Sequence, residues 1–195
     1  MKTLQVSRAT ARFLADGHPW VRPDRFTKGL ERLGVGDPVV LVDEHGARLA
    51  SALADPQAEV CARVYHRSPD RAFDAGAAVL RAWKRRDPLH TDPETDCYRL
   101  INGEADFLPG LRVERYASTV VVLVLASCAS PYVATVCGSL RDLLPGATVV
   151  VREHRDDLRR EDVSSTLDSG APIDPGAVVM GRELGVAYPL RPYAG

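Results

Sequence analysis

The sequence predicts an α+β protein in which a small antiparallel β-barrel precedes a second unit of strands around one helix. Three observations support this fold class. Apolar and polar residues alternate along short runs before position 67, a basic amphipathic segment follows, and further strand-like runs flank a second apolar helix. Alternation with period two is typical of strands, whereas spacings of three and four are typical of helices. The predicted divisions are residues 1–67, 68–88, 89–190 and 191–195.

The predicted barrel contains a short helix over residues 9–16, which ends at Gly17, and strands over 38–43, 47–53 and 59–65. Turns rich in glycine or containing Asp-Pro separate these strands, at spacings typical of antiparallel hairpins. In the last strand Val60, Ala62 and Val64 alternate with Glu59, Cys61 and Arg63. We therefore expect these two sets of side chains on opposite faces of the strand.

A helix is predicted to begin at Ser68-Pro69, because serine suits the cap and proline the first turn. Its apolar residues fall three and four positions apart, and Pro88 ends it. Residues 71–86 carry five cations and one acid, a net charge of +4, whereas residues 87–106 carry six acids and one arginine, a net charge of -5. The near-neutral overall charge is thus the sum over a chain that contains two adjacent segments of opposite charge.

The second unit is predicted to contain strands over residues 98–102, 111–116 and 119–126, the last as a central strand. A helix opening at Ser130-Pro131 and stopped by Pro145-Gly146 precedes a strand over 147–152. A closing hairpin is expected from strands 177–180 and 186–190.

Composition excludes several functional classes. The chain has 195 residues with a net charge of -1, 45% hydrophobic and 26% charged residues, which is typical of globular proteins. Its longest apolar run, residues 119–126, is far shorter than the roughly 20 residues of a membrane span. We therefore expect no membrane partner and a cytoplasmic location. The four cysteines form no C-x-x-C pair and are expected to be buried free thiols.

Familiar catalytic and metal motifs are missing from the sequence. Gly34-Val35-Gly36 precedes a strand rather than a phosphate-binding helix. Asp92, Glu94 and Asp96 alternate like calcium ligands, but the later positions of such a loop do not fit. His154 with Asp156 and Asp157 is better explained as a solvated cluster. From the residues alone, the chain is a two-domain binding protein with no catalytic residue and no metal site.

Two segments carry a more specific signal: Gly-His-Pro-Trp-Val at 17–21 and Tyr-Arg-Leu-Ile-Asn-Gly-Glu-Ala-Asp-Phe-Leu-Pro-Gly-Leu-Arg-Val-Glu-Arg-Tyr at 98–116. They resemble the N-terminal half of the bacterial 23S rRNA cytosine-C5 methyltransferases of the large-subunit methyltransferase I type. The resemblance implies a PUA-like RNA-binding barrel followed by a β-β-α-β-β middle domain.

The resemblance also implies that the Rossmann-like methyltransferase domain is absent from this chain. The family's S-adenosylmethionine site and catalytic cysteine would follow Gly195, so this chain itself is expected to hold no cofactor. The family commonly has glycine where Phe107 stands. A positive φ at that position would strain phenylalanine.

The resemblance implies an RNA-binding and substrate-positioning portion of an S-adenosylmethionine-dependent rRNA (cytosine-C5) methyltransferase, inactive alone, with 23S rRNA as its partner. Aromatic and cationic side chains are the groups that stack on bases and contact phosphates. The candidate RNA-binding residues are His18, Trp20, Arg22, Arg25, Lys28, Arg81, Lys84 and Arg85.

Several alternatives stay open. Trp20 either stacks on RNA or pins the N-terminal segment to the barrel, and the helix cations either bind phosphate or pair with the acidic stretch. Asn102, Glu104 and Asp106 either shape the mouth of an active site or cap a turn. The chain as a whole is alternatively a self-standing PUA-type RNA-binding protein, or a protein-interaction module that pairs through its final hairpin or strand 119–126, with a homodimer as one form.

Overall fold

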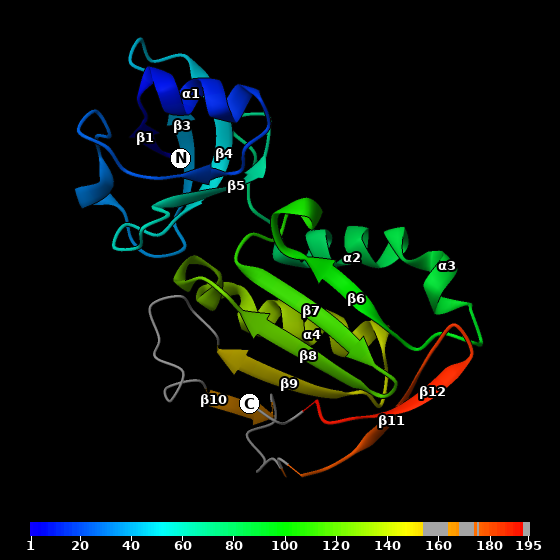
Figure 1. Cartoon of the computed structure of the whole chain (residues 1–195). Coiled ribbons are helices and arrows are strands. Elements are labelled where there is room, and N and C mark those ends of the chain that lie inside the picture. Colours follow the sequence, from blue (N-terminus) through cyan, green and yellow to red (C-terminus); the bar gives the residue numbers. More distant parts are fainter. Residues whose placement is uncertain (154–163, 168–173, 175, 193–195) are drawn as a thin grey trace.

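A computed structural model describes residues 1–153, 164–167, 174 and 176–192, which form two units joined through β5 and the loop that follows it (Figure 1). The first unit contains β1 (Lys2–Gln5), α1 (Arg8–Ala15), β2 (Trp20–Val21), the 3-10 turn η1 (Leu30–Arg32), β3 (Pro38–Val42), β4 (Arg48–Ala54) and β5 (Ala62–His66). Its sheet has the order β1-β3-β4-β5-β2, in which β1 runs parallel to β3 and the other pairs are antiparallel.

Local chemistry explains how α1 covers this sheet. Ser7 caps the helix by accepting a hydrogen bond from the backbone N–H of Thr10, and Ala11 and Leu14 face the sheet. The core beneath them is aliphatic and includes Leu4, Val39 and Leu41. The predicted helix over 9–16 and all three predicted barrel strands are therefore present.

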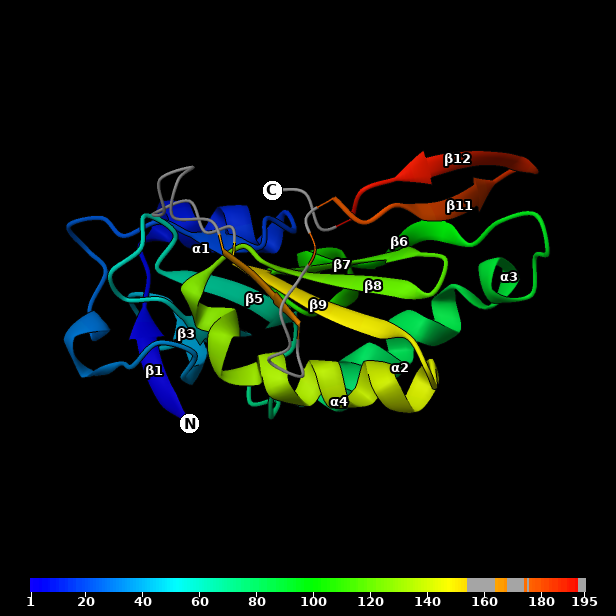
Figure 2. The ribbon, with the colours of Figure 1, turned by 90° about the horizontal axis from the view of Figure 1, so that it is seen from below.

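The second unit contains the helices α2 (Ala75–Arg85), α3 (Asp87–His90) and α4 (Val133–Leu143), with the 3-10 turns η2 (Gly103–Asp106) and η3 (Ser127–Tyr132). Its strands are β6 (Cys97–Asn102), β7 (Leu111–Tyr116), β8 (Thr119–Val124), β9 (Thr148–Glu153) and β10 (Ser164–Leu167). They form one sheet of order β10-β9-β8-β7-β6, with β8 and β9 parallel. Helices α2 and α4 lie on the same face of this sheet (Figure 2).

The expected β-β-α-β-β order is wrong. Three strands precede α4, because η2 folds β6 back onto β7 and a short turn folds β7 onto β8. The strands β11 (Val179–Glu183) and β12 (Val186–Leu190) form the predicted hairpin, but as a separate two-stranded sheet. Strand β8 lies between β7 and β9 with all six residues buried, so it offers no open edge for another chain.

The predicted start of α2 is also wrong. The helix begins at Ala75 rather than at Ser68-Pro69, because Asp74 caps it by accepting a hydrogen bond from Ala77 N–H. Before it, Asp70 adopts a left-handed conformation with a φ of 61°, which is incompatible with a continuous helix. Residues 67–74 therefore form a loop between β5 and α2.

Two further expectations concern composition. All four cysteines are free and buried, as predicted. No helix in the described part of the chain is long and apolar enough to span a bilayer.

Candidate nucleic-acid interface

Glu104 joins the barrel to the second unit. Its Oε1 atom accepts a hydrogen bond from Trp20 Nε1 at 2.8 Å and lies 3.1 Å from Nη1 of Arg63. Trp20 and Arg63 belong to the paired strands β2 and β5, and the Arg63 guanidinium lies 5.1 Å from the centre of the Trp20 ring. One carboxylate of η2 therefore holds two neighbouring strands of the barrel.

A second set of contacts fixes the same boundary. Asp55 accepts a hydrogen bond from Cys128 N–H at 3.0 Å, and the Tyr132 hydroxyl donates to the carbonyl of Gly36 at 2.8 Å. A Cβ atom at Gly36 would come within 2.7 Å of Pro131, so the close approach of η3 requires glycine. Contacts on both sides of the boundary hold the two units in one arrangement.

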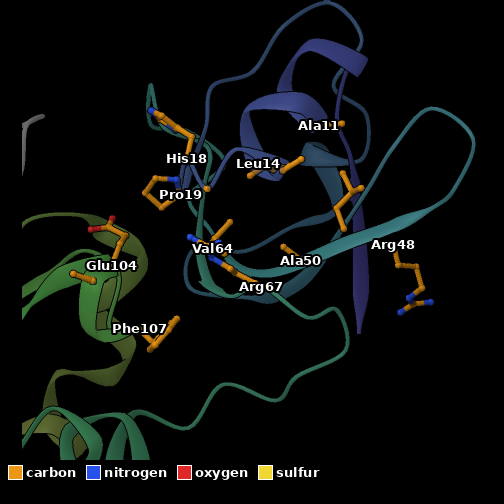
Figure 3. Close-up of a pocket in the computed structure, with 14 residues that line it drawn as sticks. Ala11, Leu14, His18, Pro19, Arg48, Ala50, Val64, Arg67, Glu104 and Phe107 are labelled. Carbon is orange, nitrogen blue, oxygen red and sulfur yellow. The ribbon is translucent and has the colours of Figure 1, made fainter. Parts of the chain in front are cut away.

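A cleft of about 600 Å³ opens at this boundary. Its barrel side is formed by α1, the segment after it and strands β4 and β5, and its other side by η2 and Phe107 (Figure 3). The charged side chains that line it are Arg48, Arg67 and Glu104. Arg48 pairs with Asp70, whereas Arg67 pairs with no carboxylate among residues 1–153 or the later described segments.

Phe107 directly follows η2 and has a left-handed backbone, with φ 61° and ψ 28°. The strain expected for a phenylalanine at that position is therefore present. The Arg85 guanidinium lies 5.5 Å from the centre of the Phe107 ring, and the centre of the His66 ring lies 6.3 Å from it. The left-handed turn directs an aromatic side chain toward the cleft (Figure 3).

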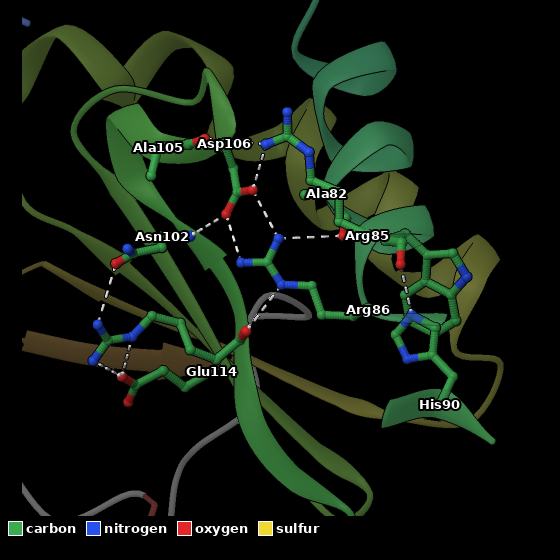
Figure 4. Close-up of polar contacts among 10 residues, drawn as sticks. Ala82, Arg85, Arg86, His90, Asn102, Ala105, Asp106 and Glu114 are labelled. Carbon is green, nitrogen blue, oxygen red and sulfur yellow. Dashed lines mark hydrogen bonds and ion pairs between the residues drawn. The ribbon is translucent and has the colours of Figure 1, made fainter. Parts of the chain in front are cut away.

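Asp106 fixes η2 to the helix α2. Its carboxylate receives both terminal nitrogens of Arg86 at 2.7 Å, Arg85 at 3.1 Å and the backbone N–H of Asn102 at 2.8 Å (Figure 4). Burial raises the pKa of Asp106, but the hydrogen bonds from Arg86 and Asn102 outweigh it, so that the pKa lies below its ordinary value. The turn that carries Glu104 and Phe107 is thus anchored by an ionised carboxylate.

The structure divides the predicted RNA-binding residues among three places. His18 lines the cleft, and its ring is nearly perpendicular to that of the neighbouring Trp20, whose backbone N–H donates to His18 Nδ1. Arg22, Arg25 and Lys28 lie on the exposed segment after β2, where Arg22 pairs with Glu59 and Arg25 covers Phe26. Whether any of them contacts RNA stays a prediction.

The helix cations separate into two groups. Arg85 and Arg86 pair with Asp106 of the acidic stretch, which was the alternative to phosphate binding. Arg81 and Lys84 are exposed on the face of α2 opposite its buried residues Ala78 and Ala82. These two side chains remain candidates for phosphate contact.

The residue patterns of the sequence mark neither Arg67 nor Phe107 as a site residue, and they place Arg63 only by alternation. Arg63 does face away from the barrel core, but that face is covered by η2, so its side chain is only 10% exposed. Alternation identifies the face of a strand and cannot show that another unit covers it. For Phe107, the departure from glycine was the available signal.

Among the described residues, the thiols and acidic clusters show no catalytic arrangement. Burial raises the pKa of Cys61 and Cys137 to about 11 and that of Cys128 to about 12, which keeps these thiols protonated. Asp92 and Asp96 accept hydrogen bonds from the backbone N–H groups of Glu94 and Arg182. Across the described residues, no three acidic, histidine or cysteine side chains form a metal-binding group. His154, Asp156 and Asp157 lie outside the described residues.

Comparisons with known proteins give this geometry a context. Residues 4–67 match a family model described as a PUA-like domain. The ribosomal RNA large subunit methyltransferase of Deinococcus radiodurans is 32% identical over 195 residues, which cover 96% of this chain and 46% of that protein. The ribosomal RNA large subunit methyltransferase I of Shigella boydii is 28% identical, with 84% of this chain and 42% of that protein covered. The chain therefore has rRNA large subunit methyltransferases as homologues and spans less than half of their length.

Solved structures agree in fold. A putative SAM-dependent methyltransferase from Streptococcus mutans aligns with a TM-score of 0.74 and 18% identity, over 97% of this chain and 48% of that chain. A putative methyltransferase solved with SAH aligns with a TM-score of 0.75 and 16% identity, over 97% of this chain and 47% of that chain.

These alignments correct the expected fold class. The expectation of an α+β chain without a methyltransferase fold is wrong, because nearly all of this chain aligns with SAM-dependent methyltransferase structures. The fold is methyltransferase-like over its described length. The error came from equating that fold with a Rossmann-like unit alone, whereas the barrel and the strand-helix unit also occur in such structures.

Proposed function

We propose that this chain binds large-subunit rRNA and positions it for S-adenosylmethionine-dependent methylation. The rRNA methyltransferase homologues and the PUA-like match support an rRNA substrate. The observation that carries the proposal is the cleft at the boundary of the two units, where Arg67 and Phe107 meet the barrel residues His18 and Pro19. Cations and aromatic rings on a rigid surface are what single-stranded RNA requires.

The finer form of the proposal names 23S rRNA as the RNA and C5 of a cytosine as the methylated atom. It rests on the resemblance of residues 17–21 and 98–116 to the cytosine-C5 methyltransferases. A cytoplasmic location follows from the same proposal, since that is where ribosomal RNA is modified in bacteria.

The cleft does not fit S-adenosylmethionine itself. That cofactor carries two cations, a sulfonium and an ammonium group, and one carboxylate, whereas the charged lining consists of two arginines and one carboxylate, whose Oε1 is already engaged by Arg63 and Trp20. We therefore assign no methyl-transfer step to the cleft. That this chain binds RNA without methylating it alone stays a prediction, which a methyl-transfer assay with purified chain and 23S rRNA would test.

RNA binding is measured by fluorescence anisotropy with labelled fragments of 23S rRNA at several salt concentrations. Neutralised phosphates release counterions, so log affinity should fall linearly with log salt concentration. Binding that is undetectable at low salt, or that does not change with salt, would contradict the proposal.

One observation favours a second candidate function, association with another copy of this chain. The hairpin β11–β12 and the residue before it expose Val178, Met180, Leu184 and Val186, each more than half exposed. Exposed apolar residues on a two-stranded sheet are a favourable surface for protein contact. Sedimentation measurements over a range of concentrations would test this association.

A further inference from the structure

We propose that the cleft between the barrel and η2 binds one unpaired guanine of the RNA. In this complex Phe107 stacks on the base, Glu104 accepts from its N1–H and N2–H edge, and Arg67 donates to O6 and N7. The inference rests on the proposed RNA-binding function and deepens it by naming the base that the cleft selects.

The dimensions of the cleft suit a nucleoside rather than a duplex. Its volume of about 600 Å³ lies within the range of sites for small molecules. Fixed contacts set the position of η2, which forms one wall: Glu104 ties η2 to β2 and β5, and Asp106 ties η2 to α2. A base that enters must therefore be unpaired and turned away from its neighbours, as in the loops that proteins read by sequence.

The polar groups of the cleft match one base better than the others. Oε1 of Glu104 is occupied by Trp20 and Arg63, whereas the described residues place no hydrogen-bond donor on Oε2. An ionised carboxylate accepts but does not donate, so it favours a base edge made of N–H groups. Guanine presents N1–H and N2–H side by side there. Adenine and cytosine each place a ring nitrogen acceptor beside their amino group.

Arg67 suits the opposite edge of the same base. A guanidinium donating to O6 and N7 is the commonest specific contact to guanine. Arg67 is exposed and lies against Gly17, where an added Cβ atom would come within 2.9 Å of Nη2. The glycine thus leaves room for this side chain beside the cleft. Figure 3 shows Arg67 on the barrel side and Glu104 on the opposite side.

The conformation of Phe107 is the independent sign of a ligand role. A bulky residue with φ 61° is strained, and such strain concentrates at sites that bind ligands. Glycine would hold the same turn without strain. The phenyl ring is thus retained against a local cost, at a place where it borders the cleft.

The test compares pentanucleotides that differ only at the central base. Fluorescence anisotropy is recorded for the whole chain with UUGUU, UUAUU and UUIUU, where inosine lacks only the 2-amino group of guanine. We expect UUGUU to bind about tenfold more tightly than UUAUU, with UUIUU between them. Since the protein is unchanged in these three measurements, folding defects cannot produce the difference.

Two variants then locate the site. Phe107→Gly suits the left-handed turn and should fold, yet it should lose about tenfold in affinity for UUGUU, whereas Phe107→Tyr should keep it. Equal affinity for all three RNAs, or full UUGUU binding by Phe107→Gly, would overturn the guanine site while leaving RNA binding intact. If 23S rRNA fragments also fail to bind, the proposed function itself falls.

Discussion

Trp20 donates its indole N–H to Oε1 of Glu104 across 2.8 Å, although 84 positions separate the two residues in the chain. The contact ties the indole to the second unit rather than to the barrel alone, whereas contact between Trp20 and RNA stays a prediction. Trp20 as a residue remains 38% exposed. The same side chain can therefore hold the boundary and still offer part of its surface to RNA.

Glu104→Ala should destabilise the chain by about 2 to 3 kcal/mol. The substitution would leave the guanidinium of Arg63 buried without its carboxylate, and removing one partner of a buried ion pair is strongly destabilising. Nε of Arg63 already lacks a hydrogen-bond partner among the described residues, so the guanidinium would keep its contact with the Trp20 ring but no carboxylate. Urea unfolding followed by Trp fluorescence measures the effect. Glu31→Ala, at an exposed pair with Arg32, is the matched control and should change stability by less than about 0.5 kcal/mol.

Asp106→Asn should remove a pH-dependent part of the stability. The pKa of Asp106 in the folded chain lies below the ordinary 3.8, so the carboxylate stabilises the fold above that pH. This contribution is lost as the pH falls from about 3.8 through the folded pKa. The unfolding free energies of the two proteins should therefore differ at pH 7 and lie closer together at pH 3. A constant difference at both values would show that Asp106 does not act through its charge.

The apolar patterns of the sequence predict strands and helices well where an element packs against only one hydrophobic core. The apolar stripe of α4 faces a single core, whereas the predicted alternation of the last barrel strand fails at Cys61, which lies in the same core as Ala62 and Val64. The boundary between the units could not be predicted, because Arg63 and Glu104 are ordinary charged residues until two separate units bring them together. Phe107 shows the converse: its departure from glycine marked a turn where a positive φ would be strained, but it predicted neither the observed conformation nor the cleft.

His90 should make the stability fall as pH decreases below about 6.5. Burial lowers the pKa of His90, and the ring stacks on Trp83 at 3.6 Å between centres. Its Nε2 lies 2.9 Å from the Trp83 carbonyl and its Nδ1 lies 2.7 Å from the Tyr98 hydroxyl, which assigns the proton to Nε2. Protonation of Nδ1 would oppose the Tyr98 hydrogen bond. Because the folded pKa is lowered, the stabilisation is complete above the unfolded pKa and declines below it.

The measurement is the thermal midpoint of the chain and of His90→Gln between pH 8 and pH 5. The original chain should lose stability across this range more steeply than the variant, which has no titrating ring. His45, which is exposed, provides the control: His45→Gln should keep the original pH dependence. Parallel curves for the chain and for His90→Gln would refute the role of His90.

Arg81→Ala and Lys84→Ala should each weaken binding to 23S rRNA fragments and flatten its salt dependence. If each cation neutralises one phosphate, the slope of log affinity against log salt should change by about 0.7 to 0.9 per substitution. Lys2→Ala, on β1 and paired with Asp37, is the control and should keep the slope. An unchanged slope in both α2 variants would assign these side chains to an ordinary solvated helix face.

Leu184→Asn tests whether the final hairpin mediates self-association. Leu184 is 79% exposed at the tip of β11–β12 and has a φ of 51°. Asparagine tolerates the left-handed region better than leucine, so the variant should keep the hairpin while removing its most exposed apolar side chain. Sedimentation velocity should then show a monomer at concentrations where the original chain forms dimers. Val35→Asn, at an exposed apolar position on the barrel, should leave the dimer intact. If the original chain stays monomeric at the highest concentrations tested, the exposed hairpin does not bind a second copy, and RNA binding remains the one proposed function.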